Sequence, residues 1–294
     1  MNEIFLGNGK LVSEKEWIKK INSLAKKSPL AKTKKQAIAL LKNSFEKAVE
    51  KRMENINDFG IFFSGGIDST LLAFYAKKLR KNFTCYSVGI DGSKDLEWAG
   101  IISERLGFDL KLKIFSLEEA EKIIKKAVDI TGADVVKAGV AAVVIACHEI
   151  SQKEGIFFSG LGSEELFAGY ERHALAKDVN KECISGLKSM WQRDLIRDTA
   201  IADKYKFEIR TPFLDEELIK VSVKIPSKFK ISKEQKKIIL REFAEKIGLP
   251  KEFTWRKKIA AQYGSGFDKA MEKLAKKNKL KTKKEYLLML EKNL

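Results

Sequence analysis

Hydrophobic positions along this chain change their period from one segment to the next. Between residues 36 and 53 the apolar side chains recur every three or four positions, which predicts one amphipathic helix. Residues 59–63 then read Phe-Gly-Ile-Phe-Phe, a run too apolar for a strand that has one face in water. Such a run is typical of a parallel strand that is buried on both faces. This part of the chain therefore predicts a helix followed by an inner strand of a parallel sheet.

The alternation of strands and helices continues as far as residue 163. We expect further strands over 83–90, 110–115 and 155–158, and helices through 71–75 and over 95–106, 117–130 and 134–153. Beyond residue 163 almost every segment has a helical pattern. This order predicts an α/β fold, in which a doubly wound parallel sheet is followed by a helical C-terminal lobe.

One hexapeptide occurs twice, because residues 60–65 and residues 155–160 both read Gly-Ile-Phe-Phe-Ser-Gly. Each copy places Ser-Gly directly after a buried strand. In an open parallel sheet, ligands bind beyond the carboxyl ends of the strands, where the strand order reverses. We therefore expect the two glycine turns to face one cleft, with two ordinary strand ends as the alternative.

Charge is concentrated at the two ends of the chain. The net charge is +17, and residues 1–55 hold 13 Lys and Arg against 6 acids, while residues 251–294 hold 13 against 5. These ends are either solvated helix faces or a docking surface for an anionic partner, RNA or an acidic subunit. Only 9 of the 57 basic residues are Arg, and base readout favours Arg. A nucleic-acid partner is therefore possible but not favoured.

The remaining composition indicates a cytoplasmic protein without a membrane partner. The longest apolar run, residues 138–147, has about half the length that a bilayer requires. The N-terminus has neither the basic nor the apolar region of a signal peptide. The three cysteines, Cys85, Cys147 and Cys183, lie far apart and match no metal-binding spacing.

The turn after the first predicted strand carries the clearest chemical signal. Ser64, Gly65, Gly66, Asp68 and Ser69 lie between that strand and a predicted helix. Glycines let backbone N–H groups approach an anion closely, and the N-terminus of the following helix adds positive potential. Asp68 suits such a site only if Mg²⁺ lies between its carboxylate and the anion. The sequence has neither the P-loop nor the dinucleotide-binding fingerprint, so the loop belongs to another class.

The Ser-Gly-Gly-x-Asp-Ser loop resembles the pyrophosphate loop of the ATP pyrophosphatases, which adenylate a carbonyl and release pyrophosphate. Three later segments, residues 159–170, 208–215 and 237–241, resemble signatures of asparagine synthetase in their order along the chain, and a basic patch at 256–258 follows. The resemblance covers residues 35–266 and is to the synthetase domain of the asparagine synthetase and β-lactam synthetase family. It implies a PP-loop fold of the adenine nucleotide alpha hydrolase type. We expect this domain over 56–266, with basic helical extensions over 1–55 and 267–294.

The resemblance implies an ATP site that uses Mg²⁺. Asp68 matches the carboxylate that coordinates Mg²⁺ on the triphosphate, and Glu164 stands where the family usually has a second metal-binding Asp. Val88 matches a residue that packs on the adenine. Ser159 and Gly160, in the second glycine turn, match positions that bind the nucleotide, as the residues of the first loop do.

Two further positions bear on the chemistry. Lys237 matches the lysine that stabilises charge building on the α-phosphate and the carbonyl, a role that needs a flexible cation. Leu161 departs from the family, since asparagine synthetases have Glu there, close to the reacting amine, and β-lactam synthetase has Tyr. Leu cannot take or give a proton. Either another residue such as Glu208 deprotonates the amine, or the substrate differs; Glu208 could instead form a structural ion pair with Arg210.

The resemblance implies an AMP-forming carbon–nitrogen ligase. The expected enzyme adenylates a carboxylate and transfers ammonia or an amine to it. In glutamine-dependent members of the family, an N-terminal glutaminase domain has cysteine as its first mature residue. Residue 2 of this sequence is Asn, so we expect the use of glutamine to require a separate glutaminase subunit. The alternatives are a tRNA-modifying enzyme that adenylates RNA on the same core, and a subunit that binds nucleotide without catalysis.

Overall fold

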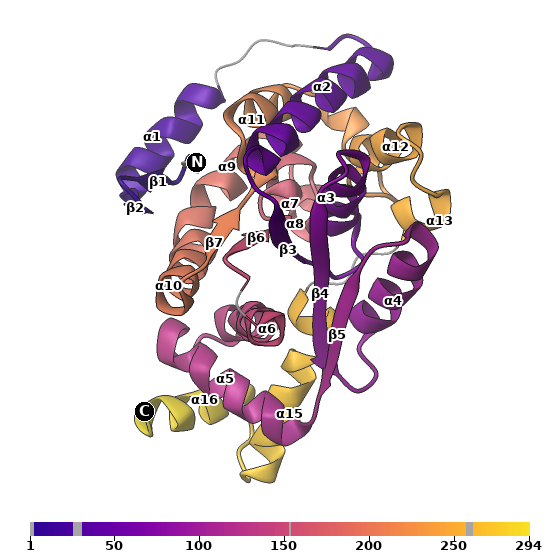
Figure 1. The fold of residues 1–294 in the computed structure, drawn as a ribbon. Coiled ribbons are helices and arrows are strands. Elements are labelled where there is room, and N and C mark those ends of the chain that lie inside the picture. Colours follow the sequence, from indigo (N-terminus) through magenta and orange to yellow (C-terminus); the bar gives the residue numbers. More distant parts are fainter. Residues whose placement is uncertain (1–2, 26–30, 153, 257–260) are drawn as a thin grey trace.

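The computed structural model describes residues 3–25, 31–152, 154–256 and 261–294 (Figure 1). At its centre is a parallel five-stranded sheet with the strand order β5-β4-β3-β6-β7. The strands are β3 (Asp58–Phe62), β4 (Asn82–Ile90), β5 (Leu110–Phe115), β6 (Ile156–Phe158) and β7 (Glu208–Arg210). The chain runs outward from β3 to β5, then returns to place β6 on the other side of β3. This reversal is the switch point of a doubly wound sheet and confirms the expected fold class.

Helices cover both faces of the sheet, which explains why its inner strands are apolar throughout. One core contains residues of α2 (Lys34–Met53), α3 (Ile67–Lys78), α4 (Lys94–Leu106), α11 (Glu216–Val223) and α12 (Ile238–Lys246). The other contains residues of α5 (Leu117–Thr131), α6 (Val135–Ser151), α15 (Phe267–Lys277) and α16 (Lys283–Lys292). Successive strand residues point to opposite faces, so Phe157 enters the second core and Phe158 the first.

The segment after β6 is mostly helical, as expected, with one exception. Its other elements are α7 (Ser163–Leu166), α8 (Glu171–Leu175), α9 (Val179–Met190), the π-helical turn η1 (Trp191–Leu195), α10 (Ile196–Tyr205), the 3₁₀ turns η2 (Pro212–Leu214) and η3 (Ser227–Phe229), α13 (Lys251–Thr254) and α14 (Ala261–Gly264). Strand β7, which was not predicted from the sequence, pairs in parallel with β6. Three residues, Glu-Ile-Arg, are too few to show the alternation of a strand. Their strand conformation depends on pairing with β6 at the edge of the sheet.

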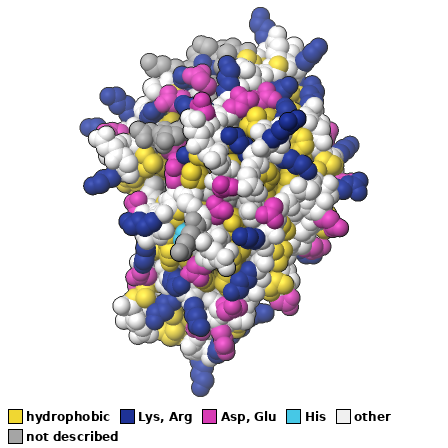
Figure 2. All heavy atoms as spheres, viewed as in Figure 1, with side chains coloured by type: hydrophobic (Ala, Val, Ile, Leu, Met, Phe, Trp, Pro, Cys, Tyr) yellow, Lys and Arg dark blue, Asp and Glu magenta, His cyan; other side chains and the backbone are white. Residues whose placement is uncertain are grey.

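The two basic ends of the chain pack against this fold. At the N-terminal end, β1 (Leu6–Gly7) and β2 (Lys10–Leu11) form an antiparallel pair, followed by α1 (Glu14–Leu24). The N-terminal end is therefore not purely helical. At the C-terminal end, α15 and α16 pack on α5 and α6. On the face shown in Figure 2, Lys and Arg side chains are spread among acidic ones.

No single helix of the described residues is both long enough and apolar enough to span a membrane. The pair α5 and α6 would have enough apolar length together, but the two helices are bent by 119° relative to each other. The predicted helix over 134–153 corresponds to α6, and residue 153 lies outside the described part of the chain.

The switch point brings the two glycine turns together. The turn after β3 and the turn after β6 lie side by side because these strands are hydrogen-bonded neighbours. A side chain at Gly160 would place its Cβ 2.9 Å from the Cβ of Asp68, so only glycine permits this approach. Both turns line one cavity, which confirms the expectation that they face a common cleft.

Candidate active site

The first turn has the geometry of an anion cradle. Gly65 has φ +63° and a Cβ there would lie 3.0 Å from the backbone of Trp98 and Ala99, so a left-handed, tightly packed position requires glycine. The N–H of Gly66 donates to the Ser64 Oγ at 3.3 Å. Helix α3 begins directly after the turn, at Ile67, and directs the positive end of its dipole into the same space.

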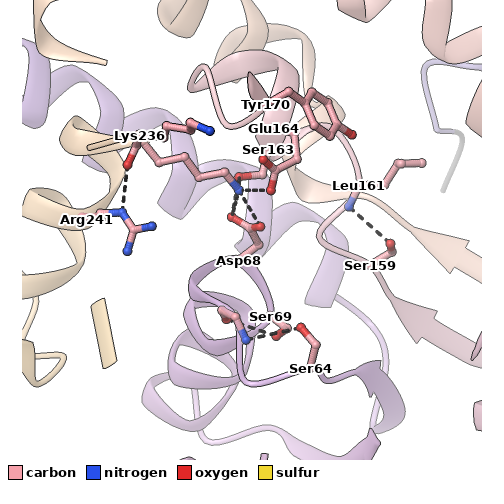
Figure 3. Close-up of polar contacts among 12 residues, drawn as sticks. Ser64, Asp68, Ser69, Ser159, Leu161, Ser163, Glu164, Tyr170, Lys236 and Arg241 are labelled. Atoms are coloured by element: carbon pink, nitrogen blue, oxygen red, sulfur yellow. Dashed lines mark hydrogen bonds and ion pairs between the residues drawn. The ribbon is translucent and has the colours of Figure 1, made fainter. Parts of the chain in front are cut away.

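A lysine and two carboxylates meet beside this turn. The Lys237 Nζ donates to the Asp68 Oδ1 at 2.8 Å and Oδ2 at 2.7 Å, and it is also ion-paired with Glu164 (Figure 3). The Ser163 Oγ donates to the Asp68 Oδ1 at 2.5 Å. The Lys237 side chain is only 2% exposed. Burial acts to lower its pKa, but the two carboxylates outweigh burial and raise the pKa, so the lysine stays charged.

Two arginines complete the positive wall of this site. Arg241 and Arg256 line a small cavity together with Ser64, Asp68 and Lys237. The Arg256 Nη2 donates to the Ser64 carbonyl at 3.3 Å, and burial lowers the pKa of both guanidinium groups. Their signal in the sequence is their place in the 237–241 and 256–258 segments, which does not by itself assign them to the site. Lys257 and Lys258 lie outside the described residues. Three cations beside a glycine turn suit a polyanion such as a triphosphate.

Next to this cluster lies a cavity of about 220 Å³, called here the inner cavity. It brings together most of the residues predicted from the sequence: Ser64, Asp68, Ser69, Val88, Ser159, Gly160, Leu161 and Glu164. Val88, from β4, is buried, and valines 140, 143 and 144 of α6 extend the same apolar wall. The cavity therefore offers both charged side chains and an apolar wall, and a nucleotide presents both kinds of surface.

Glu208 lies elsewhere, in a second cavity of about 380 Å³, called here the outer cavity. Its carboxylate accepts a hydrogen bond from the Arg210 Nε at 2.9 Å, and its side chain is 36% exposed. The ion pair considered from the sequence is therefore present. Glu208 does not line the inner cavity, whereas half-buried Leu161 lines both. In Figure 3 the Leu161 side chain points away from Asp68.

A model of the asparagine synthase family matches residues 40–181 and 174–289. The chain belongs to this family. A relative from Methanocaldococcus jannaschii, named as a glutamine-hydrolysing asparagine synthetase, is 31% identical over 88% of this chain and 56% of its own length. The glutamine-hydrolysing asparagine synthetase of Gallus gallus is 28% identical over 75% of this chain and 42% of its own length. The chain thus spans about half the length of the curated relatives that it matches.

Solved structures of synthetases are also similar to this member of the asparagine synthase family. NMN synthetase from Francisella tularensis aligns over 90% of this chain and 94% of its own, with a TM-score of 0.43 and 14% identity. NAD⁺ synthetase from Burkholderia pseudomallei aligns over 92% and 99%, with a TM-score of 0.34 and 13% identity.

Proposed function

We propose that the protein is an ATP-dependent carbon–nitrogen ligase that adenylates a carboxylate, releases pyrophosphate and transfers ammonia or an amine to the acyl group. Its family supports the use of ATP. The observation that carries the proposal is the convergence of Lys237, Arg241 and Arg256 on the glycine turn, beside the carboxylates of Asp68 and Glu164. This arrangement offers cations to a triphosphate and carboxylates to its metal.

Asp68 and Glu164 have the donor chemistry for Mg²⁺. Hard carboxylate oxygens are its preferred protein ligands, and it is usually held by one or two carboxylates together with phosphates and water. Among the described residues no group of three or more acidic, His or Cys side chains could hold a metal ion. The two carboxylates would therefore hold Mg²⁺ only with the phosphates of the nucleotide. When bound, Mg²⁺ would neutralise charge on the triphosphate.

Some of the chain's own residues would then bind the nucleotide, and Lys237 would stabilise the charge that builds during the reaction. The backbone and hydroxyl groups of Ser64, Gly65, Gly66 and Ser69 would hold the phosphates, with Ser159 and Gly160 on the opposite turn. Val88 would pack on the adenine. Lys237 would leave the carboxylates and place its Nζ beside the oxygens on which charge builds during attack by the carboxylate. Breaking the reaction into activation and transfer replaces one difficult step by two easier ones.

The products of ATP consumption test this assignment. We expect AMP and pyrophosphate in equal amounts in ³¹P NMR spectra of the protein with Mg·ATP, ammonium and a carboxylate that it accepts. ADP and inorganic phosphate would contradict adenylation, because they report attack at the γ-phosphorus.

The described chain alone should not release glutamate from glutamine. A glutaminase of the expected type needs a reactive cysteine, and thiol reactivity requires exposure and a low pKa. All three cysteines of the chain, Cys85, Cys147 and Cys183, are buried, and burial raises the pKa of each thiol. A coupled assay for glutamate checks this, with ammonium chloride as the positive control for the ligase reaction. Glutamate release by the purified chain would show that a nucleophile has been overlooked.

Free aspartate and ammonium should be poor substrates. Leu161 places an apolar side chain where the two cavities meet, and apolar surface there disfavours the charged head group of an amino acid. We therefore expect a less polar carboxylate, or one carried on a larger molecule, to be preferred. Steady-state kinetics with aspartate and ammonium at saturating Mg·ATP measure this. Efficient formation of asparagine would show that Leu161 is a tolerated variation and that aspartate is the substrate.

A further inference from the structure

The inner and outer cavities meet at two side chains. Among the residues that the structure describes, only Leu161 and Asp198 line both. The inner cavity holds the predicted nucleotide and metal residues, while the outer cavity lies on the other side of Leu161. If the acyl-adenylate forms in the inner cavity, as the proposed function requires, an amine in the outer cavity reaches it past these two residues. Asp198 is the one of the two that can exchange a proton.

Asp198 is held in a fixed position at this junction. It lies in α10, directly after the π-helical turn η1, and such turns recur at functional sites. The Arg197 Nε donates to the Asp198 Oδ1 at 2.7 Å, and the Arg197 Nη1 donates to the Asp194 Oδ1 at 3.2 Å. Asp198 is 7% exposed. Burial raises the pKa of its carboxyl group although Arg197 acts in the opposite direction, and a carboxylate with a raised pKa is a stronger base.

The charged residues of the outer cavity favour a cationic amine. Asp198, Asp203 and Glu208 line it together with one basic residue, Lys206. Such an acidic cavity raises the local concentration of cations. Ammonia and alkyl amines are mostly protonated near neutral pH, so the cavity would collect the unreactive ammonium form. A base at its inner end is then needed to produce the nucleophile.

We propose that Asp198 is the proton acceptor for the amine, which enters as a protonated ammonium or primary amine through the outer cavity. One proton passes from the nitrogen to the Asp198 carboxylate. The neutral amine attacks the acyl carbon, a carbon–nitrogen bond forms, and the carbon–oxygen bond to AMP breaks with its electron pair on the phosphate oxygen. The nitrogen then releases its second proton to solvent, leaving a neutral amide. Asp198 supplies in this way the proton chemistry that Leu161 cannot.

Asp198→Asn separates the two half-reactions. The amide oxygen of Asn can still accept the hydrogen bond from Arg197, so carboxylate-dependent pyrophosphate exchange should stay within a few-fold of the unmodified protein. Ammonium-dependent amide formation should fall by ~10²–10⁴-fold, as expected for loss of a general base. Hydroxylamine is largely unprotonated near neutral pH, so hydroxamate formation should persist. Asp129→Asn is the matched control, because Asp129 is exposed, pairs with Lys204 of the same helix and lines neither cavity. It should leave both products unchanged.

Several results would overturn this role. Normal ammonium-dependent amide formation by Asp198→Asn would exclude it, and so would an equal loss of amide and hydroxamate, which indicates a structural defect. If Asp198→Asn lowers the melting temperature, Asp198→Glu is the variant to test instead. It keeps a negative charge beside Arg197, and its carboxylate is only one methylene farther from the backbone. Amide formation within about tenfold is expected there. Absence of exchange in the unmodified protein would instead reject the proposed function itself.

Discussion

Replacing Asp68 with Asn should reduce formation of AMP and pyrophosphate to background. The carboxylate lies between the glycine turn and Lys237, and it is the acid inside the first turn. Asn is a weak ligand for Mg²⁺, so the charge of the triphosphate would remain uncompensated. The variant should still fold, because Asn can accept a hydrogen bond from the lysine and Glu164 stays paired with it. We expect a stability loss of ~1–3 kcal/mol.

The measurement combines a product assay with a thermal melt. Asp91→Asn is the matched control, since Asp91 is exposed and follows the neighbouring strand β4, outside the residues that line either cavity. The control should retain full activity. Turnover by Asp68→Asn at the rate of the unmodified protein would reject the metal assignment and, with it, the role of the first turn.

Lys237→Ala should reduce turnover by ~10²–10³-fold, the usual effect of removing one preorganised donor to developing charge. The structure adds a second consequence. Lys237 is buried between Asp68 and Glu164, so its removal leaves two carboxylates without their cation. Removing one partner of a buried ion pair costs ~3–5 kcal/mol. The variant should therefore melt at a lower temperature in the absence of Mg·ATP, and Mg·ATP should restore part of the difference.

Comparison of kcat and KM for ATP distinguishes chemistry from binding. If Lys237 acts mainly in the transition state, kcat falls and KM for ATP changes little. Lys236→Ala removes the same charge from the preceding residue, whose side chain pairs with Glu171. This control should leave kcat unchanged. A change confined to KM for ATP in Lys237→Ala would show that the lysine only binds the nucleotide.

The sequence predicted the inner sheet well because buried parallel strands leave a direct pattern. Phe59 to Phe63 is apolar on both faces, and the structure covers both faces with helices. Strand β7 left no such pattern, because its three residues depend on pairing with β6. The expectation that the turns of the repeated hexapeptide share a cleft was correct because alternating strands and helices imply a parallel sheet, in which the carboxyl ends of the strands lie along one edge.

The sequence predicted the site residues that lie in a family motif, but not those that only the fold brings together. Asp68 and Lys237 are far apart in sequence, and the family resemblance pointed to both. Their mutual ion pair, however, follows from the position of α12 beside α3. Asp198 belongs to none of the motifs, and its helical segment has the composition of an ordinary surface helix. Its place between two cavities is a property of the packed structure alone.

Exchange of labelled pyrophosphate into ATP tests the proposed adenylation most directly. The protein is incubated with Mg·ATP, [³²P]pyrophosphate and each member of a panel of carboxylic acids, without any amine. Exchange that depends on one carboxylate, and that Asp68→Asn lacks, is the predicted result, because it reports reversible formation of an acyl-adenylate. Absence of exchange with every carboxylate, from a protein that binds Mg·ATP, would contradict the ligase assignment and favour a nucleotide-binding subunit or an enzyme that adenylates RNA.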